Sequence, residues 1–147
     1  MPDVRKSSLL VPAPVISHHD VAPGMGIDFE NKKYLKLKES EGEFTDLVGG
    51  MLSPGEKILR SYKAGRDGVV FTDHRLIAIN VQGVTGKQKT LSVIPYSKIS
   101  AYSVQTASVL DIDSILTVWV SALGEFTFEF SCRTDVSGIC RCINGCE

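Results

Sequence analysis

Short apolar stretches separated by turn residues fill the chain from Lys57 to Ser131. Most are rich in β-branched or aromatic residues and too short for a typical helix, which favours strands. Turn residues at 65–68, 72–74, 83–86, 95–98 and 123–124 predict hairpin-like connections, so neighbouring strands are expected to be mostly antiparallel. The pattern predicts seven strands, near Lys57–Ala64, Gly68–Thr72, Arg75–Val81, Lys89–Pro95, Ile99–Thr106, Ile115–Ser121 and Glu125–Ser131.

The last of these stretches alternates most regularly. Phe126, Phe128 and Phe130 fall on one face of the predicted strand, and the residues between them are polar. Successive side chains of a strand point to opposite faces. One face of this strand is therefore expected in the core and the other in water.

Two helices are predicted, one on either side of the strands. Apolar residues from Phe44 to Leu52 recur at helical spacing, which predicts a short helix at about 41–52, before the first predicted strand and ending at Ser53-Pro54. Thr134 or Asp135 can cap a second helix. The apolar stripe of that helix is expected to consist of Val136, Ile139, Cys140, Ile143 and Cys146. Strands followed by one amphipathic helix predict a strongly bent sheet or partly open barrel with the helix plugging one end.

The N-terminal part of the chain lacks these patterns. Residues 1–26 hold four of the six prolines and no strand or helix period, so we expect a disordered extension outside the core. Residues 27–40 are dense in mixed charge, with a weak alternation at Leu35 and Leu37, and no element is assigned to them. The domain is expected to cover residues 27–147.

Composition narrows the function classes. A chain of 147 residues with a formal net charge of −1 has no overall field to attract nucleic acid or an anionic membrane, so such binding needs a local patch. No apolar run is long enough for a membrane helix. The prolines at 12 and 14 make a secretory signal a poor match, so we expect a cytoplasmic protein whose four cysteines are reduced thiols.

Several motifs, in order and at similar spacing, resemble the bacterial pleckstrin-homology-like (PH-like) domain family. The resemblance covers residues 41–145 and implies a PH-like barrel of two nearly orthogonal sheets capped by the C-terminal helix. It also implies members that assemble into ring-like homo-oligomers, and it implies no catalytic residues. Residues 1–26 and the Cys140-x-Cys142-x3-Cys146 ending lie outside the family pattern. The motifs are Asp67–Ile77 (DGVVFTDHRLI), Gln82–Lys87 (QGVTGK), Ile94–Tyr96, Ser103–Ala107 and Asp111–Asp113.

The candidate segments of this chain do not match the catalytic or cofactor-binding motifs with which they can be compared. His74 lies in a predicted tight turn, where a solvated residue is expected, and no G-x-S-x-G motif occurs. The segment 83–87 (GVTGK) lacks the spacing and the Ser or Thr of a phosphate loop and favours a hairpin turn. Asp111 and Asp113 lack the other ligands of a calcium loop. We therefore expect no enzyme activity and no cofactor.

The C-terminal cysteines could hold zinc or copper. On a helix, however, Cys142 points about 200° away from Cys140, so both reach one ion only if the helix unwinds. We expect Cys140 and Cys146 in the buried stripe, no bound metal, and no effect of Cys142→Ser on folding.

A local basic patch is the candidate site for an anionic ligand. Cations around the first hairpin could neutralise a phosphate headgroup by charge-assisted hydrogen bonds. Ordinary solvated charges at strand ends are the alternative, and Asp67 argues against a lipid site. The patch residues are Arg60, Lys63, Arg66, Lys87 and Lys89.

The predicted strand at 115–121 suggests an assembly surface. Its even-numbered residues from Leu116 to Val120 share one apolar face, so Ile115 and Trp119 point the other way. A barrel has one interior, so the second face must be covered by another subunit or by the helix at 43–52. The stretch 99–131 has four acidic residues and no Lys or Arg, whereas lysines lie just before it, which suits a head-to-tail contact.

Our leading hypothesis is therefore a non-catalytic PH-like module that forms a closed homo-oligomer larger than a dimer, with Trp119 at or near the contact. Such a module would present a surface to a protein partner. The alternative is reversible binding to anionic membrane lipid. We expect no nucleic-acid partner.

Overall fold

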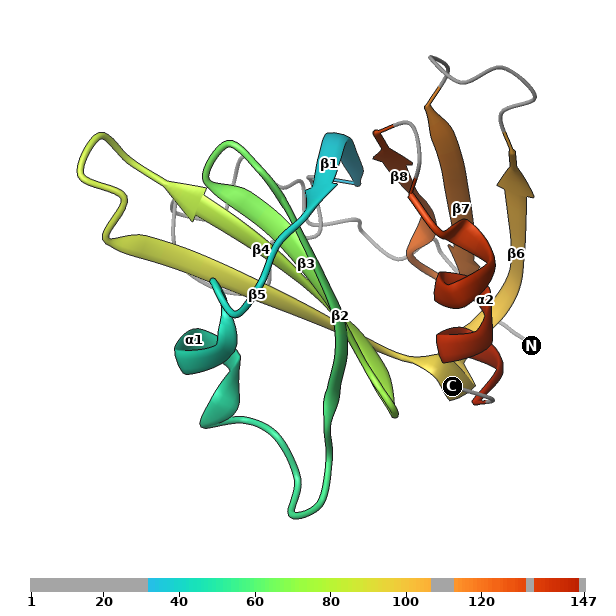
Figure 1. Ribbon diagram of the computed structural model, residues 1–147, viewed down its shortest axis with the longest axis horizontal. Helices are drawn as coiled ribbons and strands as arrows, with labels where there is room; N and C mark the ends of the chain where they lie inside the picture. The colour runs from blue at the N-terminus through green and yellow to red at the C-terminus, as the bar shows by residue number, and fades with distance from the viewer. Residues whose placement is uncertain (1–31, 107–112, 132–133, 146–147) are drawn as a thin grey trace, which may run out of the picture.

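The structure, a computed structural model, describes residues 32–106, 113–131 and 134–145. Eight described strands form one sheet with the order β5-β4-β3-β2-β1-β8-β7-β6 (Figure 1). The helices are α1 (Thr45–Gly49), the 3-10 helix η2 (Tyr96–Lys98) and α2 (Val136–Asn144). The strands are β1 (Lys33–Glu39), β2 (Ile58–Ala64), β3 (Asp67–Thr72), β4 (Arg75–Gln82), β5 (Gln88–Pro95), β6 (Ile99–Gln105), β7 (Ser114–Val120) and β8 (Gly124–Phe130).

The sheet curls into a half-barrel around one main core. Figure 1 shows strands β2 to β5 on one side, β6 to β8 on the other, and β1 between the two groups. Phe71 from the first group meets Phe128 and Phe130 from the second in this core, and Ile139 of α2 closes it. The predicted mainly β fold with a capping C-terminal helix is confirmed.

Strand β1 lies in the segment to which the sequence assigned no element. It pairs antiparallel with β2 and parallel with β8, and it joins the two groups of strands. Lys36 has φ +62°, and the register shifts between Tyr34 and Leu37, so β1 carries a bulge. Tyr34 and Leu37 are both buried although three positions separate them. The described chain thus has eight strands instead of seven, and the first helix follows one strand.

The hairpin predictions hold except at 95–98. Strands β2–β3, β3–β4, β4–β5 and β7–β8 are antiparallel neighbours joined by short turns. Strands β5 and β6 instead lie at opposite ends of the sheet order, and η2 carries the chain from one to the other. Proline restricts the backbone of residue 95, but it does not require a hairpin in which the next strand pairs with β5.

Helix α1 is shorter than the predicted 41–52 and ends at Gly49-Gly50. Its buried side chain, Val48, packs with Phe44 on the outer face of β3 and β4. Phe44 lies where Gly68 has no side chain, so a Cβ there would meet the Phe44 ring and approach the Tyr62 carbonyl oxygen at 2.5 Å. The predicted apolar stripe is therefore correct at Phe44, Leu47, Val48 and Leu52 but wrong at Met51, which is exposed, and the stripe covers the outside of the half-barrel.

Helix α2 begins as predicted, with the Asp135 side chain accepting a hydrogen bond of 3.1 Å from the Gly138 N–H. The prediction that Cys140 rather than Cys142 belongs to the buried side of the helix is wrong. Cys142 is fully buried with Val136 and Ile139, whereas Cys140 is half-buried. The buried face of α2 is therefore formed by residues at positions 136, 139 and 142, spaced three apart. Cys146 lies outside the described residues.

Candidate functional site

The outward side of β6, β7 and β8 is the first candidate surface. Register pairs Trp119 with Ala101 and Glu125, and Thr117 with Ser103 and Thr127, so these side chains share one face of the sheet. We call this surface the β7 outer face. It comprises Ala101, Ser103, Ile115, Thr117, Trp119, Glu125, Thr127 and Glu129.

The two faces of β7 differ in burial as the alternation predicts. Leu116 and Val118 are fully buried, whereas Trp119 is 37% exposed and Ile115 is half-buried. Helix α1 packs against Val70, with Ile77 and Ile79 in the same cluster, on the other group of strands. The alternative that Trp119 lies beneath the helix at 43–52 is therefore wrong.

Charge on the β7 outer face is less one-sided than the sequence suggests. Lys36, on the bulge of β1, places its Nζ 3.3 Å from a carboxylate oxygen of Asp113 and 3.9 Å from one of Glu129. The sequence does not predict this cation here, because the pattern of residues 27–40 indicates no strand. Asp111, the other acidic residue of the Asp111–Asp113 motif, lies outside the described residues.

The structure does not gather all five predicted basic residues. Arg60 lies beneath the start of α2, with its guanidinium 3.5 Å from Asp135, and its side chain is mostly buried. The Nζ of Lys63 is 2.7 Å from a carboxylate oxygen of Glu43. Arg60 and Lys63 therefore have local acidic partners, in keeping with a structural role.

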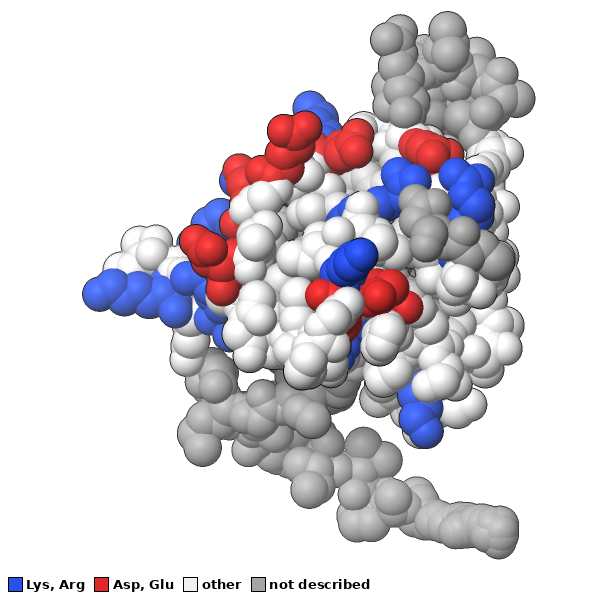
Figure 2. All heavy atoms as spheres, turned by 60° about the horizontal axis from the view of Figure 1, so that its bottom comes forward, with Lys and Arg blue, Asp and Glu red and all other residues white. Residues whose placement is uncertain are grey.

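The other three basic residues lie on two adjacent hairpins. Arg66 donates a hydrogen bond of 2.7 Å to the Gly83 carbonyl, and so joins the β2–β3 turn to the β4–β5 turn. Lys89 donates to the Gly86 carbonyl at 3.1 Å, and Lys87 is exposed. Figure 2 shows Lys and Arg side chains gathered at the projecting end of the molecule, at the left, where Figure 1 places the β4–β5 hairpin. We call Arg66, Lys87 and Lys89 the basic end.

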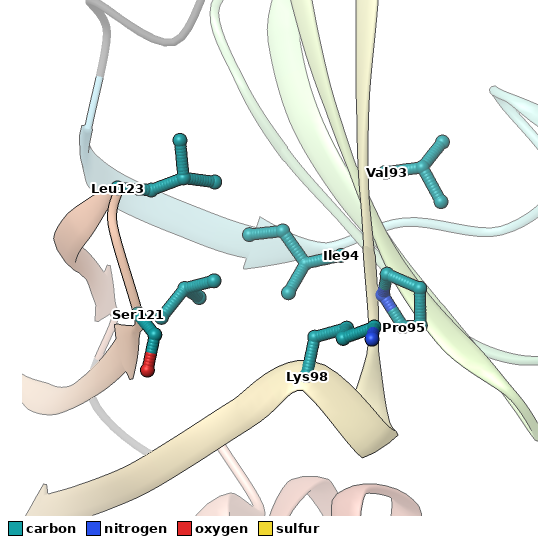
Figure 3. A pocket seen from close by; sticks show the side chains of 7 residues that line it. Val93, Ile94, Pro95, Lys98, Ser121 and Leu123 are labelled. Carbon is teal, nitrogen blue, oxygen red and sulfur yellow. The ribbon is translucent and has the colours of Figure 1, made fainter. Parts of the chain in front are cut away.

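An apolar groove between β5 and the β7–β8 turn was not predicted. It has a volume of about 240 Å³. Figure 3 shows Leu123 and Ser121 on one side of the groove and Ile94 of β5 on the other, with Lys98 below them. The lining residues come from distant positions that only the curl of the sheet brings together, so no local sequence signal marks the groove. They are Val93, Ile94, Pro95, Lys98, Val120, Ser121 and Leu123.

A wider hollow of about 530 Å³ lies between the β3–β4 turn and the end of α2. His74 lines it with a largely exposed side chain, and the His74 Nδ1 is 3.2 Å from a carboxylate oxygen of Asp73. This placement agrees with the prediction of a solvated turn residue.

The described residues contain no cluster of three or more His, Cys, Asp or Glu side chains placed to hold a metal ion. Burial raises the pKa of the Cys140 thiol, which disfavours the thiolate needed for a metal ligand. Over the same part of the chain, no helix has the length and apolar character to cross a membrane.

Comparison with known proteins agrees with this architecture. Two uncharacterized Bacillus subtilis proteins are similar: YjqA, 48% identical over 71 residues, and YozO, 30% identical over 89 residues. The matches cover 48% and 60% of this chain, and the chain spans 57% of YjqA and 76% of YozO.

Solved structures extend the comparison to three dimensions. A crystal structure of a DUF1696 family protein with a pleckstrin-homology domain, from Shewanella loihica PV-4, has a TM-score of 0.66 and 34% identity over 77% of this chain and 99% of that one. A pleckstrin-homology domain from Shewanella amazonensis SB2B has a TM-score of 0.54 and 36% identity over 72% and 87%. The family model of the bacterial PH domain matches residues 29–146. The chain therefore belongs to the bacterial PH domain family.

Proposed function

We propose that the protein is a non-catalytic PH-like module that assembles into a closed homo-oligomer through the β7 outer face. The observation that carries the proposal is the contrast between two outer faces. Helix α1 covers the outer face of β3 and β4. The β7 outer face instead presents Trp119, 37% exposed, beside Ala101, and the half-buried Ile115 lies farther along the same face of β7.

The composition of this face suits a protein contact. Tryptophan is enriched at energetically important interface positions because it buries a large apolar area with few rotatable bonds. Glu125 lies opposite Trp119 and adds an acidic rim. The basic end, with Arg66 and Lys87, offers a surface of opposite charge elsewhere on the molecule. A contact between two different surfaces is head-to-tail, and it forms a ring when its rotation closes.

Solution mass tests this proposal. The full chain should sediment as a species larger than a dimer at tens of micromolar, and Trp119→Glu should lower the mass toward the 16.0 kDa monomer while the β signal in circular dichroism remains. Met51→Glu is the matched control, because Met51 is also 37% exposed but lies beside α1. A monomeric wild-type protein, or equal losses in both variants, would contradict the proposal.

A second candidate function is reversible binding to anionic lipid, and the meeting of two cationic hairpins at the basic end favours it. Phosphate groups attract such clusters, and salt weakens the attraction. The full chain should then sediment with phosphatidylserine vesicles at low salt and be released at high salt. Arg66→Gln with Lys87→Gln should abolish sedimentation, whereas Lys57→Gln with Lys98→Gln should not. No sedimentation at any salt concentration excludes this function.

A further inference from the structure

We infer that the apolar groove between β5 and the β7–β8 turn is the docking site of residues Leu9–Ile16 of the same chain, which add a strand to the edge of β5. The groove has apolar walls formed by Ile94, Val120 and Leu123. Three consecutive residues of β5, from Val93 to Pro95, line it. Since successive side chains of a strand point to opposite faces, a hollow lined by three in a row lies along the edge of β5.

That edge of β5 can accept a partner. Strand β5 pairs with β4 and stands at one end of the sheet order, so its other edge has no strand beside it among the described residues. An unpaired edge presents backbone N–H and C=O groups that can bind an extended segment. The groove adds apolar surface next to these groups, which favours an apolar segment.

The position of Lys32 brings the N-terminal segment to the groove. Its ammonium donates a hydrogen bond to the carbonyl of Leu123, a groove residue, and lies 5.7 Å from the centre of the Phe126 ring. Strand β1 runs parallel to β8 with Lys33 opposite Thr127, so the chain before Lys33 leaves the sheet at the end that holds the β7–β8 turn. A stretch as long as residues 17–31 can span up to about 50 Å, at roughly 3.3 Å per residue. This length allows residues 9–16 to reach the edge of β5.

The sequence of the segment suits an edge strand. Residues 9–16 read LLVPAPVI, an apolar run with proline at positions 12 and 14. In an extended strand, alternate residues direct their backbone N–H and C=O groups to the same edge. Both prolines are even-numbered, so the edge without an N–H at two positions is the even-numbered one. The odd-numbered residues Val11, Ala13 and Val15 all have an N–H, and these groups point to the other edge. The segment can thus pair with β5 along one edge, while its proline edge blocks a further strand.

With this docking, the prediction of disorder for residues 1–26 applies only to the residues outside 9–16. Hydrogen exchange of the full chain, followed by mass spectrometry, tests it. The N–H groups of residues 11, 13 and 15 should exchange at least about tenfold more slowly than in an unstructured peptide. Ser121→Trp fills the groove from an exposed position and should remove this protection, whereas Ser97→Trp, also exposed, should not.

A reciprocal variant tests the segment itself. Val11→Asp should speed exchange at residues 90–95 of β5, whereas Val4→Asp, in the same extension, should leave it unchanged. Unprotected residues 11–15 in the wild-type protein would overturn the inference, as would protection that survives Ser121→Trp. Protection that falls on dilution would also overturn it, because a tethered segment binds its own chain independently of concentration.

Discussion

Asn80 of β4 donates a hydrogen bond of 2.7 Å from its Nδ2 to the hydroxyl oxygen of Tyr34 in β1, inside the half-barrel. Both side chains are buried, and the Tyr34 ring stacks on Phe128 with centroids 5.3 Å apart. A polar contact in an apolar core is costly when one partner is lost. This bond therefore helps to fix the position of β1, the strand that joins the two groups.

Tyr34→Phe should lower the free energy of unfolding by about 1–3 kcal/mol, because it deprives Asn80 of this buried acceptor while preserving the ring. The control is Tyr102→Phe, since the Tyr102 hydroxyl donates to the exposed Asn144 side chain at 2.9 Å, where water can replace it. Urea unfolding of both variants measures the difference. Equal losses of unfolding free energy in the two variants would show that the buried hydrogen bond stabilises the protein no more than the exposed one.

Acid should destabilise the protein through Glu56. Burial alone would raise the pKa of this carboxyl, but hydrogen bonds from Arg75, Thr72 and the Ser53 N–H lower it to about 2, from an ordinary value of 4.5. The folded state therefore binds this proton less readily than the unfolded chain. The stabilisation is complete above pH 4.5 and is lost as the pH falls toward 2, by on the order of 1–3 kcal/mol.

Urea unfolding at pH 7 and at pH 3 checks this prediction. Glu56→Gln should reduce the loss of stability between these two values, because the variant has no carboxyl to protonate there. Glu43→Gln should retain the wild-type loss, since the side chain of Glu43 is 44% exposed and pairs with Lys63 at the surface, where ion pairs contribute little to stability. An unchanged pH dependence in Glu56→Gln would refute the assignment.

Gly68→Ala should destabilise the protein by about 1–3 kcal/mol, because the new methyl group would overlap the Phe44 ring and crowd the Tyr62 carbonyl oxygen. Gly49→Ala is the matched control. A Cβ at Gly49 meets nothing within 4 Å, and this residue ends α1, so alanine should be neutral or stabilise by up to about 1 kcal/mol. Thermal unfolding followed by circular dichroism distinguishes the two.

The burial of Cys142 reverses the prediction that Cys142→Ser is harmless. Serine replaces the fully buried, weakly polar sulfur atom with a smaller and more strongly hydrated hydroxyl, so the variant should lose about 1–3 kcal/mol of stability. Cys140→Ser, at a half-buried position, should stay within about 0.5 kcal/mol of the wild type. Chemical denaturation compares them, and a neutral Cys142→Ser would indicate that the core adapts around α2.

The strands with regular alternation were predictable, and β1 was not. In β8 each buried Phe is two positions from the next, so periodicity identifies both the strand and its core face. In β1 the bulge at Lys36 separates the buried Tyr34 and Leu37 by three positions and leaves Leu35 53% exposed. The weak alternation of Leu35 with Leu37 was therefore misleading, because one apolar residue points outward and the other inward.

Surfaces were predictable to the extent that they lie on one element. The alternation around Trp119 gives its outward direction without knowledge of the fold. The groove and the basic end depend on contacts between distant segments, such as Arg66 with Gly83 or Lys32 with Leu123. Arg60 was predicted in the basic patch from its place near the first hairpin. The packing of α2 instead brings Asp135 next to it, so distant contacts remove it from the patch.

The place of β1 between β2 and β8 also orders events during synthesis. Among the described strands β8 is the last to leave the ribosome, so β1 has a neighbour on one edge only until translation of this sheet is almost complete. Lys32 and Leu123, which meet at this junction, are 91 positions apart, and closing so large a loop is slow. A nascent chain that stalls before β8 exposes the free edge of β1, where another nascent chain on the same polysome can pair and start aggregation.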